Sequence, residues 1–214
     1  MPKRANEMIR IGLISDAHAT CAPVEEALSI FREQHVDKIL CAGDNAGYGT
    51  ELDRTVDLLI ESDCTSILGN HEIWYLEAAD ATQQNGVAEY FGGLSLVLDT
   101  KIAGKSLYMV HASPPRSYMD GIKLLDENGK LLTDRKQEWT KRLRSLERDI
   151  LVVGHTHQIF CERLGDTLVV NPGSTKFNHS CAILTLPDMT FEVFALSNKQ
   201  VSYVWNWGLN EVRL

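Results

Sequence analysis

The chain has 214 residues and a formal net charge of −8, from 21 basic and 29 acidic side chains. An acidic surface repels the phosphate backbone, which excludes a long nucleic acid as the expected partner. No apolar run approaches the roughly 20 residues that span a bilayer, so no membrane partner is expected either. With 44% apolar residues, this length is enough for one well-packed domain, which we expect over residues 1–214.

The N-terminal residues and the cysteines indicate the compartment. No apolar segment typical of a secretory signal follows the first residues. The five cysteines are odd in number, lie far apart and form no C-x-x-C pair. Such cysteines are typical of reduced thiols rather than of a disulfide framework. We therefore expect a cytoplasmic protein, and the sequence leaves open whether it forms a homo-oligomer.

The first third of the chain alternates short apolar strands with amphipathic helices. Strands are predicted at residues 9–15, 38–41 and 65–68, with helices at residues 23–34 and 51–62 between them. This β-α-β-α-β order predicts a parallel sheet with right-handed crossovers.

The middle of the chain is predicted to be mostly helical at residues 72–91. Two strands follow at residues 94–102 and 106–110, and Gly104-Lys105 suits the turn between them. A charged amphipathic helix is predicted at residues 134–148.

The last third is rich in strands, with turn signals at Gly165-Asp166 and Pro187-Asp188. The predicted strands lie at residues 150–153, 159–164, 167–170, 181–186 and 191–195. Part of this region is therefore antiparallel. Two sheets packed face to face, with helices outside, would bury the apolar residues of both halves.

Polar side chains with metal-binding or catalytic chemistry follow five of the predicted strands. They are Asp16 and His18, Asp44, Asn70 and His71, His111, and His155 and His157. Each motif alone has a plain structural explanation as a turn, a helix cap or a hydrogen-bonded histidine. Ligands bind at the carboxyl ends of strands in open α/β sheets, so these side chains are candidates for one common site.

The joint occurrence of these residues favours the metal site. Five of the seven histidines fall in the strand-end motifs, and only His35 and His179 lie outside them. A mixture of imidazole, carboxylate and amide oxygen suits manganese, iron, zinc or nickel rather than a soft metal or an all-oxygen calcium site. Eight groups are too many for one ion, and they suit two ions that share a bridging carboxylate.

The order Asp-x-His, Gly-Asp, Gly-Asn-His, His and Gly-His-x-His, running from Asp16 to His157, resembles the calcineurin-like metallophosphoesterase superfamily. The later segment 171–174, Asn-Pro-Gly-Ser, resembles its small bacterial and archaeal phosphodiesterase branch. This resemblance implies an α/β fold, the four-layer αββα sandwich with two mixed β-sheets flanked by helices.

The resemblance also implies a role for each motif residue. The first metal would be bound by Asp16, His18 and His157, and the second by Asn70, His111 and His155. Asp44 would bridge the two metals, and His71 would contact the leaving group without being a ligand. The implied cofactors are two divalent transition metal ions. Manganese is favoured, and iron, nickel and zinc are the alternatives.

The implied activity is hydrolysis of a small phosphate ester, with a phosphodiester or a small nucleotide favoured as substrate. A metal-bridging hydroxide would attack in line, His71 would act as general acid, and Asn70 would help to hold the phosphate. The catalytic residues on this hypothesis are His71, Asn70 and Asp44. The alternatives are a phosphomonoesterase, a dinucleotide polyphosphate hydrolase, and a non-catalytic protein-binding scaffold on the same fold.

Three positions depart from the superfamily's usual motifs. Ala19 stands where Gly is usual, which predicts a less permissive backbone beside the site. Glu72 stands where Asp is usual, and its longer side chain is expected to orient the His71 imidazole differently. The segment 43–49, Gly-Asp-Asn-Ala-Gly-Tyr-Gly, resembles the form found in small phosphodiesterases and some nucleotide phosphatases.

Three aromatic residues lie outside the ligand motifs. The sequence leaves open whether Tyr48 stacks on a base or packs under its loop. Trp205 and Trp207 are interpreted as packing or interface residues.

Overall fold

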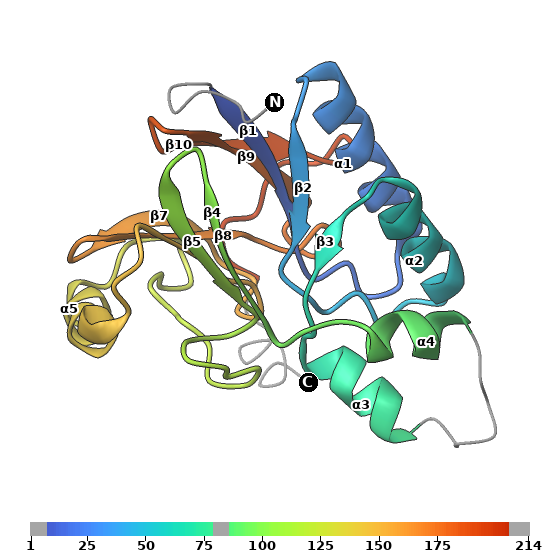
Figure 1. Ribbon diagram of the computed structural model, residues 1–214, viewed down its shortest axis with the longest axis horizontal. Helices are drawn as coiled ribbons and strands as arrows, with labels where there is room; N and C mark the ends of the chain where they lie inside the picture. Colours follow the sequence, from blue (N-terminus) through green and yellow to red (C-terminus); the bar gives the residue numbers. More distant parts are fainter. Residues whose placement is uncertain (1–7, 79–85, 206–214) are drawn as a thin grey trace.

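The computed structural model describes residues 8–78 and 86–205, which form two five-stranded sheets packed face to face (Figure 1). The first sheet has the order β10-β9-β1-β2-β3. Its strands are β1 (Ile9–Ile14), β2 (Lys38–Cys41), β3 (Thr65–Ser66), β9 (Ser180–Leu186) and β10 (Thr190–Ala195). The pairs β1–β2 and β2–β3 are parallel, and β9 pairs antiparallel with both β1 and β10.

The second sheet has the order β4-β5-β6-β8-β7 and is also mixed. Its strands are β4 (Val97–Ile102), β5 (Lys105–Val110), β6 (Ile150–Val152), β7 (Ile159–Leu164) and β8 (Thr167–Pro172). The strands β5, β6 and β8 run parallel, whereas β4 and β7 pair antiparallel at the two edges.

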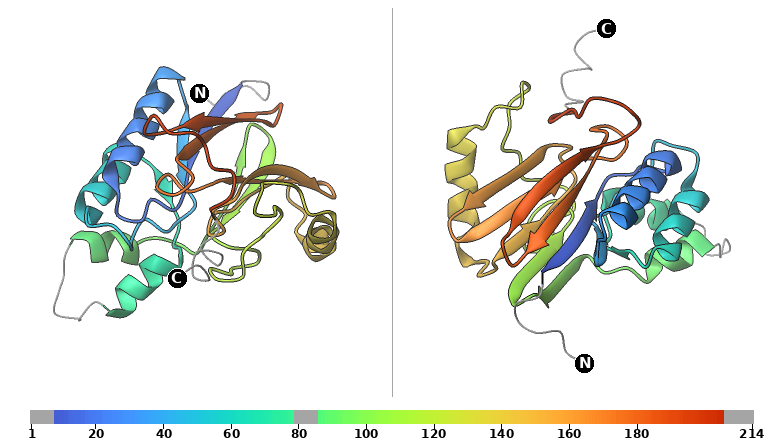
Figure 2. Two further views of the ribbon diagram at one scale, coloured as in Figure 1. Left: turned by 180° about the vertical axis from the view of Figure 1, so that it is seen from behind. Right: turned by 90° about the horizontal axis from the view of Figure 1, so that it is seen from above.

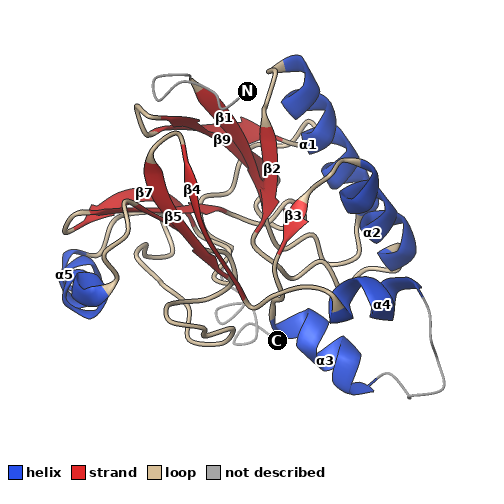
Figure 3. Ribbon diagram, viewed as in Figure 1, coloured by secondary structure: helices blue, strands red, loops and turns tan. Residues whose placement is uncertain are grey.

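Helices cover the outer faces of both sheets (Figures 2 and 3). α1 (Cys21–Glu33) and α2 (Leu52–Glu61) pack on the first sheet, and α5 (Thr133–Arg142) packs on the second. α3 (Asn70–Ala78) and α4 (Gly86–Gly92) lie beside the carboxyl ends of β2 and β3 (Figure 1). The four-layer α/β sandwich implied by the motifs is therefore confirmed.

Apolar side chains of β1 alternate between the two faces of the first sheet, so this strand contacts both the second sheet and a helix. Ile11 and Leu13 point into the core between the sheets, where they pack with Met109 of β5. Ile14 points the other way and packs against Phe31 of α1. Full burial of each such side chain contributes about 1.5–3 kcal/mol, so the period-two pattern fixes which face of β1 meets the second sheet.

Three predicted elements are shorter in the structure than the sequence suggested, by two residues or more at one end. The strand predicted at residues 94–102 begins only at Val97. The predicted strand 65–68 ends at Ser66. Ile67 N–H still donates to the Cys41 carbonyl of β2, but Ile67 also bridges to Ser95, and Leu68 N–H donates to the Ser95 carbonyl, so the chain leaves β2 there. The predicted helix 134–148 ends at Arg142 and continues as a 3-10 turn, η1 (Leu143–Ser145). The chain must turn there to enter β6, and the left-handed φ of 47° at Glu147 marks that reversal.

The predicted helical region 72–91 corresponds to α3 and α4, and its residues 79–85 lie outside the described part of the chain. Among the described helices, none has the length and apolar character needed to cross a bilayer.

Gly12 allows α1 to pack closely on β1, and this contact gives a first prediction. A β-carbon at Gly12 would lie 2.7 Å from Cδ2 and Cε2 of the Phe31 ring. Gly12→Ala should therefore lower the free energy of unfolding by about 1–3 kcal/mol, since overpacking forces the ring or the helix to shift. Urea denaturation measures the change.

Gly86→Ala is the control, because nothing lies within 4 Å of the β-carbon that it would add. The combined change Gly12→Ala with Phe31→Leu should cost less than the two single changes added together. An unchanged stability in Gly12→Ala alone would show that this contact does not limit the approach of α1.

Candidate metal centre

The loops after β1 and β2 are joined by three backbone hydrogen bonds. N–H groups of the first loop donate to carbonyls of the second over 2.6–3.0 Å, in the pairs Asp16 with Gly43, His18 with Asp44 and Ala19 with Asn45. Ala19 lies in the left-handed region, with φ of 51°. This conformation costs a residue with a β-carbon about 1–2 kcal/mol, in agreement with the less permissive backbone predicted there.

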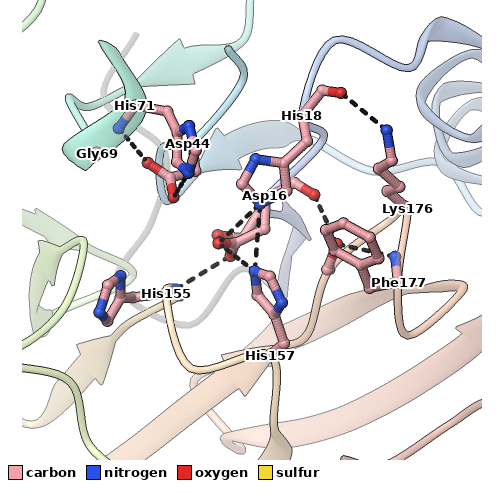
Figure 4. A network of polar contacts seen from close by, with 12 residues as sticks. Asp16, His18, Asp44, Gly69, His71, His155, His157, Lys176 and Phe177 are labelled. Carbon is pink, nitrogen blue, oxygen red and sulfur yellow. Dashed lines mark hydrogen bonds and ion pairs between the residues drawn. The ribbon is translucent and has the colours of Figure 1, made fainter. Parts of the chain in front are cut away.

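Asp16, His18 and His157 form the first cluster of candidate ligands, and all three are buried. Oδ1 of Asp16 lies 3.1 Å from Nε2 of His157 and 3.9 Å from Nε2 of His18. The two Nε2 atoms are 3.2 Å apart. Figure 4 shows the Asp16 carboxylate between the two rings. Nδ1 of His18 lies 3.1 Å from the Ala46 carbonyl, which fixes the proton there and leaves Nε2 as the metal-binding atom.

Asn70, His111 and His155 form the second cluster beside Asp44. Oδ1 of Asn70 lies 3.2 Å from Nε2 of His111 and 3.0 Å from Nδ1 of His155. Oδ2 of Asp44 lies 3.3 Å from Nε2 of His111. The remaining nitrogen of each ring contacts a backbone carbonyl, at 2.6 Å for His111 and 2.8 Å for His155. In their neutral form, both rings therefore turn a lone pair toward the cluster.

The chemistry of this second cluster fits a bound cation. Besides the two ring nitrogens, the side-chain amide of Asn70 lies 3.2 Å from Oδ2 of Asp44, with either its oxygen or, when the amide is turned over, its NH2 group facing that carboxylate. With the Asn70 oxygen facing the cluster and the rings neutral, these atoms are all acceptors and repel one another unless a cation lies between them; without a cation, the turned amide satisfies them through its NH2 group. Oxygen and imidazole nitrogen ligands in this combination suit a divalent transition metal.

The electrostatics of the rings agree with this fit. Burial lowers the pKa of His18 to about 4 and that of His155 to about 4, so both are neutral at pH 7. Neutral imidazole is the form that binds metals. Burial also tends to lower the pKa of His111, but the neighbouring Asp44 carboxylate has the larger effect and raises that pKa to about 10. Asp44 thus draws a proton to His111, which a cation would displace.

Glu72 organises the backbone around Asp44. Its carboxylate accepts hydrogen bonds from four backbone N–H groups, at 2.5–2.9 Å, from Asp44, Asn45, Ala46 and Gly69. The expectation that Glu72 orients the His71 imidazole is therefore wrong, because its oxygens are directed at the backbone instead. Burial, with the charge of Asp44, raises the pKa of Glu72 to about 7.

The same contacts explain why Asn70 and His71 lie in a helix rather than at a strand end. The bond from Gly69 N–H to Glu72 spans three residues at the start of α3, as in a capping box. Oδ1 of Asp44 accepts the His71 N–H at 2.9 Å and satisfies another free donor of the first turn. The N-terminus of α3 therefore points at the centre.

His71 lies beside both clusters. Its Nε2 is 4.0 Å from Oδ2 of Asp44, and its side chain is 12% exposed. A β-carbon at Gly47 would lie 2.2 Å from Nδ1 of His71, so the ring requires a glycine there. His18, Asp44 and His71 also offer ligand atoms within 4.8 Å of one another. The geometry thus allows His71 to act as a ligand or as a proton donor.

A sequence model of the calcineurin-like phosphoesterase superfamily domain matches residues 9–189. This chain belongs to that superfamily. It is 28% identical over 120 residues to an uncharacterized protein of Methanocaldococcus jannaschii. The aligned region is 49% of this chain and 49% of the relative, so the chain spans about half the length of the curated relative that it matches.

Solved structures share the superfamily fold across most of the chain. A metallophosphoesterase from Sphaerobacter thermophilus has a TM-score of 0.67 and 19% identity, covering 89% of both chains. A putative diadenosine tetraphosphatase has a TM-score of 0.62 and 20% identity, covering 91% of this chain and 96% of the other. An archaeal phosphodiesterase has a TM-score of 0.57 and 17% identity, covering 88% and 100%.

In this calcineurin-like phosphoesterase, residues outside the strand-end motifs also support the centre. Ser15 Oγ donates to Oδ2 of Asp16 at 2.5 Å, and Ser174 Oγ donates to its carbonyl at 2.6 Å. The sequence offers a signal for Ser15, which directly precedes the Asp16 motif. It offers none for the contact of Ser174 with Asp16, which only the fold creates.

A stack of aromatic rings packs against His157. Phe177 stacks on its imidazole at 5.1 Å between ring centroids, and Trp205 stacks on Phe177 at 4.0 Å. Trp205 is thus a packing residue, as the sequence suggested, and Trp207 lies outside the described residues. No sequence signal marked Phe177.

The four hydrogen bonds of Glu72 give a second prediction. In Glu72→Gln one oxygen becomes an NH2 group, which faces backbone donors and cannot accept from them. The free energy of unfolding should fall by about 3 kcal/mol, since each buried donor left unsatisfied costs about 1–3 kcal/mol. Affinity for the metal should fall as well, because the backbone that carries Asp44 loses its anchor.

Glu77→Gln is the matched control, a glutamate exposed on the same helix. Thermal unfolding and metal titration by calorimetry measure both effects. Equal behaviour of the two variants would contradict the anchoring role.

Proposed function

We propose that this phosphoesterase is a metal-dependent phosphodiesterase that hydrolyses a phosphodiester or a small nucleotide. One observation carries the proposal: two clusters of candidate metal ligands adjoin at Asp44. Its carboxylate groups with His111 and His155 of the second cluster and also with His18 of the first. A centre of two divalent ions with a shared carboxylate fits this arrangement.

The proposed ligands follow the two clusters. Asp16, His18 and His157 would hold one ion, and Asn70, His111 and His155 would hold the other, with Asp44 between them. Manganese is favoured, with iron, nickel or zinc as alternatives. When bound, the two ions would neutralise phosphoryl oxygens and lower the pKa of a water molecule, so that hydroxide is available near neutral pH for in-line attack.

The chain's own residues would bind the ester and move one proton. The Asn70 amide lies at the N-terminus of α3, where partial positive charge favours a phosphate. His71 would donate a proton from its ring to the departing oxygen. Burial lowers the pKa of His71, while the nearby Asp44 carboxylate opposes this effect. An anionic ester beside the ring would further favour its protonated form.

Two features support the substrate class. The segment 43–49 has the Gly-Asp-x-x-Gly-Tyr-Gly form, and Gly47 is required by its approach to His71. An archaeal phosphodiesterase and a putative diadenosine tetraphosphatase share the fold. Because a putative diadenosine tetraphosphatase shares the fold, dinucleotide polyphosphate hydrolysis is the second candidate. A phosphomonoesterase is the remaining enzymatic alternative. The retained ligand and proton-donor side chains favour catalysis over a scaffold.

A cytoplasmic location is also part of the proposal, and the five free thiols support it.

The metal requirement is a third prediction. Metal-stripped protein should not hydrolyse bis-p-nitrophenyl phosphate, and adding Mn²⁺ should restore turnover more than Ni²⁺, Zn²⁺ or Mg²⁺. Asp44→Ala should abolish the restored activity, because it removes the carboxylate between the two clusters. Absorbance of p-nitrophenolate measures the rate, and p-nitrophenyl phosphate in parallel compares diester with monoester.

Asp57→Ala, a change at an exposed position of α2, is the control for loss of a carboxylate. Absence of turnover on both esters and on diadenosine tetraphosphate, from folded protein with bound metal, would refute the catalytic proposal and favour the scaffold.

The role of His71 is a fourth prediction. His71→Ala should keep its metal content and lose about 10²–10⁴-fold in turnover, the usual contribution of a general acid. Elemental analysis and steady-state rates measure the two quantities. Loss of metal together with activity would instead identify His71 as a ligand. The control is His35→Asn. His35 is exposed just after the end of α1, and asparagine tolerates its left-handed φ of 52°.

A further inference from the structure

Two exposed aromatic side chains lie beside the candidate centre. Seven large apolar residues are exposed in the described part of the chain: Met8, Tyr48, Ile60, Trp74, Met119, Leu132 and Tyr203. Tyr48 and Trp74 lie against the ring of His71, and the Met119 carbonyl contacts His155. Single exposed apolar residues are normal on a protein surface, whereas two exposed aromatic rings against one polar residue of a candidate site indicate a binding surface.

Two of these rings flank the proposed proton donor. The Tyr48 ring centroid lies 4.8 Å from that of His71, and the Trp74 centroid lies 4.9 Å from it. Tyr48 is 54% exposed and Trp74 is 44% exposed. Both residues therefore contact His71 through their rings and are still exposed to solvent. The Tyr48 ring also packs edge-on against Phe177, at 5.8 Å between ring centroids.

The backbone holds Tyr48 in this place. It has a left-handed φ of 58° and lies between two glycines. A β-carbon at Gly47 would meet His71, and one at Gly49 would lie 2.1 Å from the Ala19 carbonyl oxygen. The backbone on both sides of Tyr48 therefore packs closely against residues of the centre. Its ring also lies 4.8 Å from that of His18, so it spans from a candidate ligand to the proton donor.

We infer that Tyr48 and Trp74 bind a planar aromatic part of the leaving group, such as the base of a nucleoside. The inference rests on the proposed function, which places the departing oxygen at His71. A group attached to that oxygen must extend past His71, where these two rings offer apolar faces. Every nucleobase has a π-face, so this stacking would select bases as a class and tolerate any one of them.

Binding of adenosine 5′-monophosphate and ribose 5-phosphate tests the inference by affinity rather than by activity. Calorimetry on the metal-loaded protein should show tighter binding of the nucleotide, by roughly 5- to 150-fold, the usual range for base stacking on aromatic side chains. Tyr48→Leu and Trp74→Leu should each reduce this ratio, and the double variant should bring it close to one. Affinity for ribose 5-phosphate should stay unchanged.

Tyr203→Leu is the matched control, because Tyr203 is also a tyrosine with 54% exposure. Its ratio should equal that of the unmodified protein. Equal losses for both ligands in the Tyr48 and Trp74 variants, or no preference for the nucleotide in the unmodified protein, would overturn the inference.

The two proposals fail in different ways. Hydrolysis of bis-p-nitrophenyl phosphate without any preference for the nucleotide would remove only the aromatic subsite. A nucleotide preference that depends on Tyr48 and Trp74, in a protein that hydrolyses no ester, would keep the base-binding surface and remove the catalytic role, including the identification of the bound base with a leaving group.

Discussion

The Glu72 carboxylate holds together the backbone on which the centre depends. Its two oxygens gather N–H groups from the loop after β2 and from the start of α3. Burying a carboxylate is costly unless its hydrogen-bonding capacity is used, and here four donors compensate that cost. The result is that Asp44 lies at the N-terminus of α3, where it also accepts the His71 N–H. This anchored backbone sets the position of Asp44, the residue proposed to lie between the two ions.

The centre lies where the two sheets meet. Asp16, His18, Asp44 and Asn70 follow strands of the first sheet, whereas His111, His155 and His157 follow strands of the second. Each proposed ion would therefore take ligands from both sheets. Neither sheet contains a complete cluster by itself, so the packing of Ile11 and Leu13 against Met109 is a condition for the chemistry as well as for stability. Metal binding and sheet packing should reinforce one another for this reason.

Left-handed backbone conformations recur among the proposed ligands. Five of the seven proposed ligands have a left-handed φ, between 46° and 64°: Asp16, His18, Asp44, His155 and His157. Such conformations cost about 1–3 kcal/mol each and persist only where the surroundings enforce them. The bonds between the loops after β1 and β2, and the bond from His155 N–H to Asp16, provide that enforcement. The left-handed turn reverses the chain directly after a strand, so both residues of a D-x-H or H-x-H pair can face one pocket.

The sequence by itself determined the alternating strands and helices, the two-sheet fold and the set of strand-end residues. These properties follow from local periodicity and from the order of motifs, which a single chain displays directly. Tertiary structure decided what Glu72 contacts, where Asn70 and His71 lie and which aromatic rings surround the centre. Glu72 reaches backbone donors 26 to 28 residues away, and Phe177 reaches His157 from another loop. Contacts of this kind depend on the final arrangement of both sheets, and no spacing along the sequence encodes them.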